Sequence, residues 1–241
     1  MPKPAASHRT IAGTRPALGA ECSLAAIGNQ QHLHGQPRSG PRRVHGARVA
    51  RKCIMKPILL IYATREGHTR RIVEHVGAVL AAQQRSTEII DAAHLPRGFS
   101  FAKYCSAIVA ASLHLGKHEP EIARFVKRYL PELHQIPTLF LSVSLSERTV
   151  EDPQAPAEKR AQAEADVART INSFLKQTGW RPSDVAAVAG ALLYSKYNFL
   201  VRFIMKRIAN KAGGPVDTSR DYEFTDWLKL DRLITGFAGS V

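Results

Sequence analysis

The fold is decided by one stretch, Ile58-Leu59-Leu60-Ile61-Tyr62-Ala63-Thr64-Arg65-Glu66-Gly67-His68-Thr69. Its first five residues are continuously apolar and rich in strand-forming types, which predicts a strand buried on both faces of a sheet. The polar residues that follow, with a glycine among them, predict a loop. Apolar residues then recur at helical spacing: Ile72, Val73, Val76, Val79 and Leu80. The sequence therefore reads as strand, loop and helix in succession.

The same alternation continues to the end of the chain. Strands are predicted at 87–91, 106–111, 137–143 and 185–190, and amphipathic helices at 122–130, 167–175, 200–208 and 227–234. The polar stretch 144–158 is assigned no element, and Pro131 is expected to end the helix before it. Because strands alternate with helices, we predict an α/β fold: a doubly wound, five-stranded parallel sheet with helices on both faces.

The charge of the 241-residue chain is concentrated near its start. Residues 1–55 carry nine Lys or Arg and one Glu, and so hold +8 of the net charge of +14. This segment has no aromatic residue and no long apolar periodicity, so we predict a disordered basic extension. Nucleic-acid binding is disfavoured, because base stacking would use aromatic side chains among the basic ones.

Two interpretations of residues 1–55 stay open. The Arg-rich, acid-poor composition is compatible with an organelle transit peptide, although prolines interrupt the amphipathic helix that such a peptide should form. The alternative is an upstream extension, translated or not, with the functional chain starting at Met55. We favour the second interpretation because Met55 stands just before the first strand, and we take 56–241 as a single domain.

Composition excludes several other classes of protein. The longest nearly uncharged apolar stretch, 185–194, is about half of the roughly 20 residues that a membrane-spanning helix needs. Three cysteines are too few for a disulfide framework or a four-ligand zinc site, so we expect a reducing compartment and no metal. His114 and His118 are expected to lie across a loop and a helix start, and Cys105 to be a small buried residue.

The loop 64–69 has the features of a site for a phosphate monoester. In open parallel sheets, ligands bind beyond the carboxyl ends of the strands, where the strand order reverses. Gly67 permits close backbone approach, and the amides at the start of the next helix point toward a bound anion. Without a ligand, Thr64 and Thr69 would be an N-cap and a solvated hydroxyl. The P-loop, the Gly-x-Gly-x-x-Gly loop and the carboxylates of a response regulator are all missing.

This loop resembles the FMN phosphate loop of flavodoxins. Further segments are similar to the bacterial quinone-dependent protoporphyrinogen oxidases, a family of the flavodoxin class: 111–116, 140–143, 180–182, 189–194, 202–206, 213–218 and 225–227. The resemblance covers residues 56–228 and implies a flavodoxin-like fold with one noncovalent FMN. It also implies a cofactor site of three loops, in which the first holds the phosphate and the others border the isoalloxazine ring: Thr64, Arg65, Glu66, Gly67, His68 and Thr69; Ser112, Leu113, His114, Leu115 and Gly116; Ser142, Val143, Ser144 and Leu145.

The resemblance further implies the oxidation of protoporphyrinogen IX to protoporphyrin IX, a step of heme biosynthesis, with a membrane quinone as electron acceptor. Lys117, Lys196 and Arg202 are candidates to bind the two propionates of the substrate, and no catalytic residue is assigned. A flavodoxin-type electron carrier and an NAD(P)H-dependent quinone reductase stay open as alternatives. Carrier flavodoxins are typically acidic, whereas 56–241 carries +6. A homo-oligomer also stays open.

Residues 194–214 combine apolar and basic side chains without an acidic one. A helix packed on the core is one interpretation. The other is an interfacial helix, whose bases meet anionic lipid headgroups while its apolar face reaches the acyl region. On the second interpretation we expect a cytoplasmic protein that is peripherally associated with the anionic surface of the inner membrane.

Overall fold

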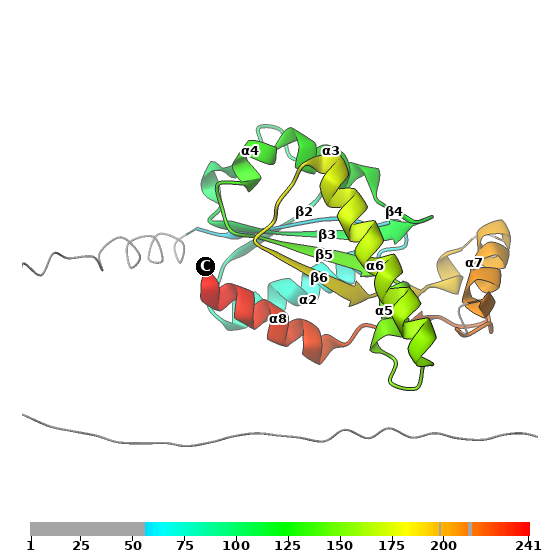
Figure 1. The fold of residues 1–241 in the computed structure, drawn as a ribbon. Helices are drawn as coiled ribbons and strands as arrows, with labels where there is room; N and C mark the ends of the chain where they lie inside the picture. Colours follow the sequence, from blue (N-terminus) through cyan, green and yellow to red (C-terminus); the bar gives the residue numbers. More distant parts are fainter. Residues whose placement is uncertain (1–55, 198, 212–213) are drawn as a thin grey trace, which may run out of the picture. The chain divides into compact units, whose positions relative to one another are not determined.

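A computed structural model describes residues 56–241 with gaps at residues 198, 212 and 213 (Figure 1). The described residues all belong to one compact unit, Arg42–Val241. The prediction of a disordered extension over residues 1–55 lies outside the described residues.

A parallel sheet runs through this unit. Its strands are β1 (Ile58–Ala63), β2 (Thr87–Asp91), β3 (Ser106–His114), β5 (Thr138–Ser144) and β6 (Asp184–Ala189). They lie in the order β2-β1-β3-β5-β6, and every neighbouring pair is parallel. The predicted doubly wound, five-stranded parallel sheet is confirmed. Ala63 pairs with Ala111 and Ala111 with Ser142, so the carboxyl ends of β1, β3 and β5 meet at one edge.

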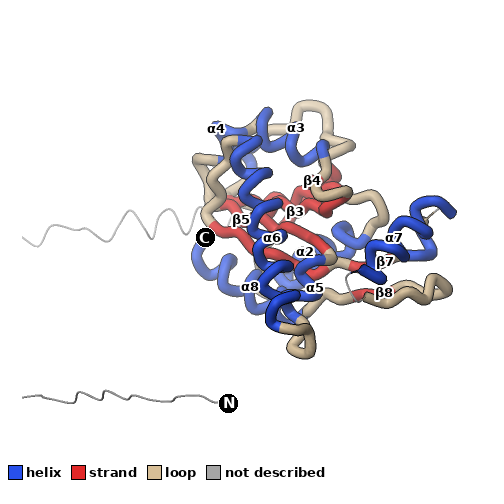
Figure 2. The backbone as a smooth tube through the Cα atoms, turned by 45° about the vertical axis from the view of Figure 1, so that its right-hand side comes forward, coloured by secondary structure: helices blue, strands red, loops and turns tan. Residues whose placement is uncertain are grey.

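Helices cover both faces of the sheet (Figure 2). On one face lie α2 (His68–Ala82) and the closing helix α8 (Trp227–Ser240). On the other lie α3 (Pro120–Arg128), α4 (Leu130–Leu133) and the long α6 (Ala157–Thr178), which ends at Gly179 with a φ of 74°. The short helix α5 (Ser146–Glu151) packs against α6.

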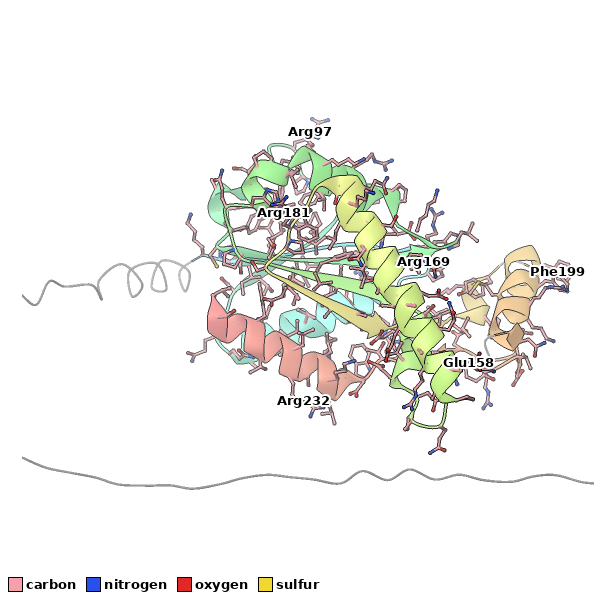
Figure 3. The ribbon with its side chains drawn as sticks, viewed as in Figure 1. Arg97, Glu158, Arg169, Arg181, Phe199 and Arg232 are labelled. Carbon is pink, nitrogen blue, oxygen red and sulfur yellow. The ribbon has the colours of Figure 1, made fainter. Side chains whose placement is uncertain are left out.

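A further segment, residues 190–226, follows β6 and is called the α7 segment here. It contains β7 (Ala191–Leu192), the 3₁₀ turn η2 (Tyr194–Lys196), α7 (Phe199–Lys211) and β8 (Tyr222–Glu223). Strands β7 and β8 pair antiparallel. The segment lies beyond the carboxyl end of β6, and Phe199 points outward from α7 (Figure 3). Among the described residues, no helix has the length and hydropathy needed to cross a membrane.

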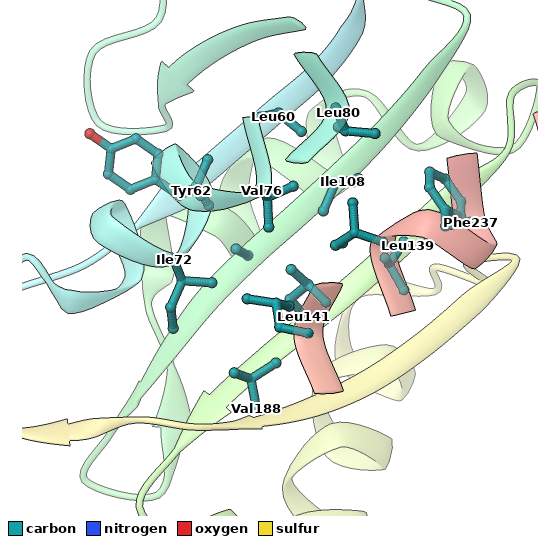
Figure 4. Packing of buried hydrophobic residues seen from close by; sticks show 14 of the residues in the cluster. Leu60, Tyr62, Ile72, Val76, Leu80, Ile108, Leu139, Leu141, Val188 and Phe237 are labelled. Atoms are coloured by element: carbon teal, nitrogen blue, oxygen red, sulfur yellow. The ribbon is translucent and has the colours of Figure 1, made fainter. Parts of the chain in front are cut away.

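Side chains of the central strands alternate between two cores, because successive residues of a strand point to opposite faces. Leu60 and Tyr62 pack with the apolar faces of α2 and α8 (Figure 4). Leu59 and Ile61 pack in the second core with α3 and α6. All six residues of β1 are buried, as its continuous apolar run predicted.

Two predictions for local structure are wrong. Strand β3 extends beyond the predicted range 106–111, because it continues to His114 and pairs antiparallel with β4 (Lys117–His118). Leu115 and Gly116 both have positive φ, at 48° and 76°, which closes a two-residue hairpin. The stretch 144–158 is not without structure, since it contains α5 and the start of α6. The helix predicted before Pro131 does end before it: α3 ends at Arg128, and Pro131 lies in the first turn of α4, where a residue without an N–H is tolerated.

Candidate cofactor site at the carboxyl edge of the sheet

The strand order reverses beside β1. The chain leaves β1 for β2 on one side and then returns to β3 on the other, so the β1–β3 junction is the place where open α/β sheets bind ligands. The loop 64–67 starts at this junction.

The first loop presents free backbone amides. Gly67 is the N-cap residue of α2 with a φ of 93°, and no side chain caps the helix. The first turn has no acidic residue, and the N–H groups of His68, Thr69 and Arg70 have no hydrogen-bond partner among the described residues. The Gly67 N–H donates to Thr64 Oγ1 over 3.1 Å, which shapes the turn into the helix. An uncapped helix start of this kind favours a bound anion.

The Thr69 hydroxyl is buried without a partner. Its side chain is 1% exposed, and Oγ1 has no hydrogen bond within the described part of the chain. The expectation of a solvated hydroxyl at this position is wrong, because the first turn of α2 packs Thr69 inward. Leaving a buried hydroxyl unsatisfied costs about 1–3 kcal/mol. A ligand oxygen would remove that cost, so the residues of this loop fit a phosphate monoester.

His68 is tied to the α7 segment. Its Nε2 lies 2.8 Å from Thr225 Oγ1, and that hydroxyl donates to the Ala189 carbonyl over 2.7 Å. Because the hydroxyl proton is used in this way, Nε2 carries the imidazole proton and Nδ1 is an acceptor. Nδ1 is buried and has no partner among the described groups. Burial lowers the pKa of His68, so the ring is neutral at pH 7.

Arg65 and Ser112 connect the first two loops through Glu119. Arg65 Nε lies 3.0 Å from Glu119 Oε2, and the Ser112 hydroxyl donates to Glu119 Oε1 over 3.2 Å. Glu119 is 3% exposed, so its charge is balanced inside the protein. We call Arg65, Glu119 and Ser112 the loop clamp. Sequence reasoning missed Glu119, although Pro120 behind it is a signal for a helix start.

Glu66 lies near the α7 segment. Burial first, and then the Glu66 carboxylate, raise the pKa of Tyr197 to about 12. Helix α2, which follows the loop, is also joined to the α7 segment by an ion pair between Arg71 and Glu223 at 2.6 Å. The first loop is therefore supported by residues that follow it by more than a hundred positions.

The second predicted loop is the β3–β4 hairpin. Leu113 and His114 are half-buried, Gly116 is exposed, and Leu115 at the tip is 79% exposed. His118 is buried, and its Nε2 lies 2.8 Å from the Ser142 hydroxyl. Burial lowers the pKa of His118 to about 4. The expectation that His114 and His118 span a loop and a helix start is wrong, since both lie in hairpin strands. The described residues contain no cluster of metal-ligating side chains.

The third predicted loop is mostly buried. Ser142, Val143 and Ser144 have exposed fractions of 5% or less, and Leu145 is half-buried. The Ser144 hydroxyl accepts from the Glu147 N–H over 3.3 Å, while that of Ser142 is used by His118. A ligand at this loop would meet backbone and Leu145 rather than the serine hydroxyls.

The three basic candidates for propionate binding differ in their surroundings. Lys117 and Lys196 are exposed. Arg202 donates from Nε to the Tyr194 carbonyl over 3.2 Å and from Nη2 to the Tyr197 carbonyl over 3.3 Å. Its guanidinium thus holds η2 against α7.

The sheet order and the first loop define a flavodoxin-type α/β protein, and the sequence comparison agrees. Residues 59–219 match the model of the flavodoxin domain family, and the chain belongs to this family. The family expected from the sequence is confirmed, and with it the chain is an enzyme of an FMN-dependent oxidoreductase class.

Relatives with assigned names are similar over most of the chain. Protoporphyrinogen IX dehydrogenase (quinone) of Escherichia coli (strain K12) is 30% identical over 169 residues, covering 70% of this chain and 87% of that protein. The Leishmania major protein of the same name is 29% identical over 183 residues, covering 75% and 74%. Among solved structures, oxidised flavodoxin 1 from Bacillus cereus is 14% identical with a TM-score of 0.40, covering 77% of this chain and 99% of that one.

Proposed function

We propose that residues 56–241 form an FMN-binding domain that oxidises protoporphyrinogen IX to protoporphyrin IX, with a membrane quinone as electron acceptor. The names of the two relatives support this reaction. The observation that carries it is the uncapped start of α2, with the orphaned Thr69 hydroxyl, at the reversal of strand order.

In this proposal the three loops at the carboxyl edge hold the cofactor. Thr64, Gly67, His68 and Thr69, with the free amides of α2, bind the phosphate, while 112–116 and 142–145 border the ring system. Bound FMN would supply two-electron chemistry, in repeated cycles for the six electrons by which substrate and product differ. The loop clamp keeps the first two loops at a fixed spacing.

The α7 segment is the proposed contact with the membrane. Phe199 and Phe203 are 86% and 59% exposed, and Lys206 and Arg207 are exposed on the same helix. Exposed aromatic and basic side chains on one helix are typical of reversible attachment to an anionic surface. We propose that the protein is cytoplasmic and meets its quinone at the inner membrane in this way.

The assay that tests the reaction uses the purified, FMN-loaded protein. We expect protoporphyrin fluorescence to appear when protoporphyrinogen IX and a quinone are supplied, with no comparable quinone reduction when NADH replaces the porphyrinogen. Quinone reduction by NADH alone would assign the protein to the NAD(P)H-dependent quinone reductases. A loaded protein that reacts with neither donor would contradict the proposed reaction and leave the electron carrier as the remaining alternative.

The cofactor site is tested at Thr69. Thr69→Val keeps the shape of the side chain and removes the orphaned hydroxyl, so we expect FMN retention to fall while the thermal stability of the FMN-free protein is unchanged or higher. Thr69→Ser is the matched control, because it keeps the hydroxyl. If Thr69→Val binds FMN as tightly as the wild type, the phosphate does not lie at this loop.

A further inference from the structure

A cavity of about 390 Å³ lies next to the third cofactor loop. It is open on one side and lined by residues of α5, α6, β7 and the end of α7, and Leu145 and Ser146 line the side next to that loop. Because Leu145 also ends the loop proposed to border the flavin, this cavity adjoins the place where a substrate must meet the cofactor. Its volume falls within the range of about 300–1,000 Å³ that is usual for small-molecule sites.

The walls of the cavity are largely apolar. Leu145, Ala163, Leu192, Ala209 and Phe224 contribute to its lining. Leu145 precedes α5 and Ala163 lies in α6, while Leu192, Ala209 and Phe224 belong to the α7 segment, which therefore forms one wall of the cavity. A flat or ring-shaped apolar ligand would lose water-exposed surface on entering it.

Two cations in the lining have no carboxylate partner. Arg148 lies with its guanidinium 4.7 Å from the centre of the Phe224 ring, and no ion pair of the described residues includes Arg148 or Lys159. The acidic side chain of the lining, Asp166, is instead engaged by Arg169 and by Gln162 Nε2. The cavity therefore offers two unpaired positive charges beside an apolar wall.

We propose that this cavity binds the propionate-bearing edge of the tetrapyrrole, with Arg148 and Lys159 each pairing with one carboxylate; this rests on the function proposed above. The apolar wall takes the pyrrole rings, and the guanidinium of Arg148 is held ready by its contact with Phe224. A quinone headgroup has no carboxylates and would leave both cations unpaired. Arg202, a candidate from the sequence, has its guanidinium engaged by two carbonyls.

Measurements of porphyrin binding test the proposal independently of turnover. Protoporphyrin IX and its dimethyl ester are titrated into the FMN-loaded wild type and the Arg148→Gln/Lys159→Gln double variant, with porphyrin fluorescence as the readout. We expect the double variant to raise the Kd of the free acid at least tenfold, and the ester to bind both proteins equally weakly. Lys176→Gln is the matched control, because Lys176 is an exposed base of α6 outside the cavity.

The outcomes distinguish a failure of this proposal from a failure of the proposed function. If the wild type oxidises protoporphyrinogen IX and the double variant does so with the same KM, the cavity is not the substrate site although the function stands. Equal affinity of the wild type for acid and ester also overturns the proposal. If the wild type loads FMN but neither binds the porphyrin nor oxidises the porphyrinogen, the proposed function itself fails. FMN content and melting temperature of each variant verify that it is folded.

Discussion

At the scale of single residues, we expect His68 to make cofactor binding depend on pH. In the FMN-free protein, burial lowers the pKa of His68, the Glu223 carboxylate raises it and Arg71 lowers it further. Its Nε2 is fixed on Thr225, and the edge of the ring approaches Trp227 at 6.3 Å between centroids. A phosphate near Nδ1 would favour the protonated ring, so its arrival would raise the pKa and take up a proton.

From this we predict that FMN affinity rises as the pH falls through the pKa of the His68 ring in the FMN complex toward the lower pKa of the free ring, by up to about tenfold per unit between the two. Equilibrium titration of flavin fluorescence measures it. Riboflavin, which lacks the phosphate, should show no such dependence, and His68→Gln should flatten the FMN curve. If the FMN affinity does not depend on pH in either the wild type or His68→Gln, Nδ1 does not lie near the phosphate.

Single residues of the site were predicted unevenly. The first loop was located correctly at the β1–β3 junction, because an apolar run, a glycine and a helix identify such a loop without long-range information. Glu119 and Thr225 were missed because their partners are distant in sequence. Glu119 contacts Arg65, 54 positions away, and Thr225 contacts His68, 157 positions away. The burial of Thr69 and of the Ser142 hydroxyl likewise depends on tertiary packing.

At the scale of elements, the β3–β4 hairpin combines exposure with backbone strain. Leu115 has a φ of 48°, and for a residue with a branched side chain this conformation costs about 1–2 kcal/mol. Asn accepts it more readily and is favoured before Gly in two-residue hairpins. A leucine that is 79% exposed at such a position gains little from burial, which points to a role toward a ligand.

We therefore predict that Leu115→Asn raises the free energy of unfolding by about 1 kcal/mol and weakens FMN retention. Urea unfolding of the FMN-free protein and a flavin titration measure the two effects. Leu228→Asn is the control, because Leu228 is also exposed but lies in the helix α8, where Asn is not favoured. If Leu115→Asn gains stability without losing FMN, the hairpin tip does not border the ring.

Helix α7 gives the second prediction at this scale. Lys206→Gln/Arg207→Gln should move the protein from anionic vesicles into solution at low salt, because each base contributes about 1 kcal/mol near an anionic surface. Vesicle sedimentation measures it, with FMN content unchanged. Arg97→Gln/Arg181→Gln removes the same charge from exposed positions that Figure 3 shows away from α7, and should not alter binding. If the wild-type protein does not bind anionic vesicles at low salt, α7 does not attach the protein to a membrane.

The main elements were predictable because each carries its own periodicity. β1 is a continuous apolar run and α8 has a regular apolar stripe, so both were located from the sequence. The β3–β4 hairpin was not predicted, because Leu115 is a residue type that disfavours positive φ. β7 and β8 have two residues each, too few to show an alternating pattern. The membrane interpretation also included four residues whose side chains the structure does not describe: Leu200, Ile204, Ile208 and Lys211.

For the whole molecule, the folded unit is expected to be independent of the basic start of the chain. The first strand begins at Ile58, and the family match begins at residue 59. We predict that a chain starting at Met55 keeps its FMN content, melting temperature and kcat within about twofold of the full chain. Parallel purification and assay measure this. Loss of solubility or of flavin in the shorter chain would place residues 1–54 in the folded domain.

The loop clamp should also affect how quickly the cofactor can bind. Its bonds join Arg65 and Ser112 to Glu119, so the first two loops lose much of their conformational freedom when the chain folds. A pre-organised site of this kind has little ordering left to do on association. FMN should therefore enter in a single kinetic phase whose rate rises linearly with FMN concentration, with no slow rearrangement of the first two loops afterwards.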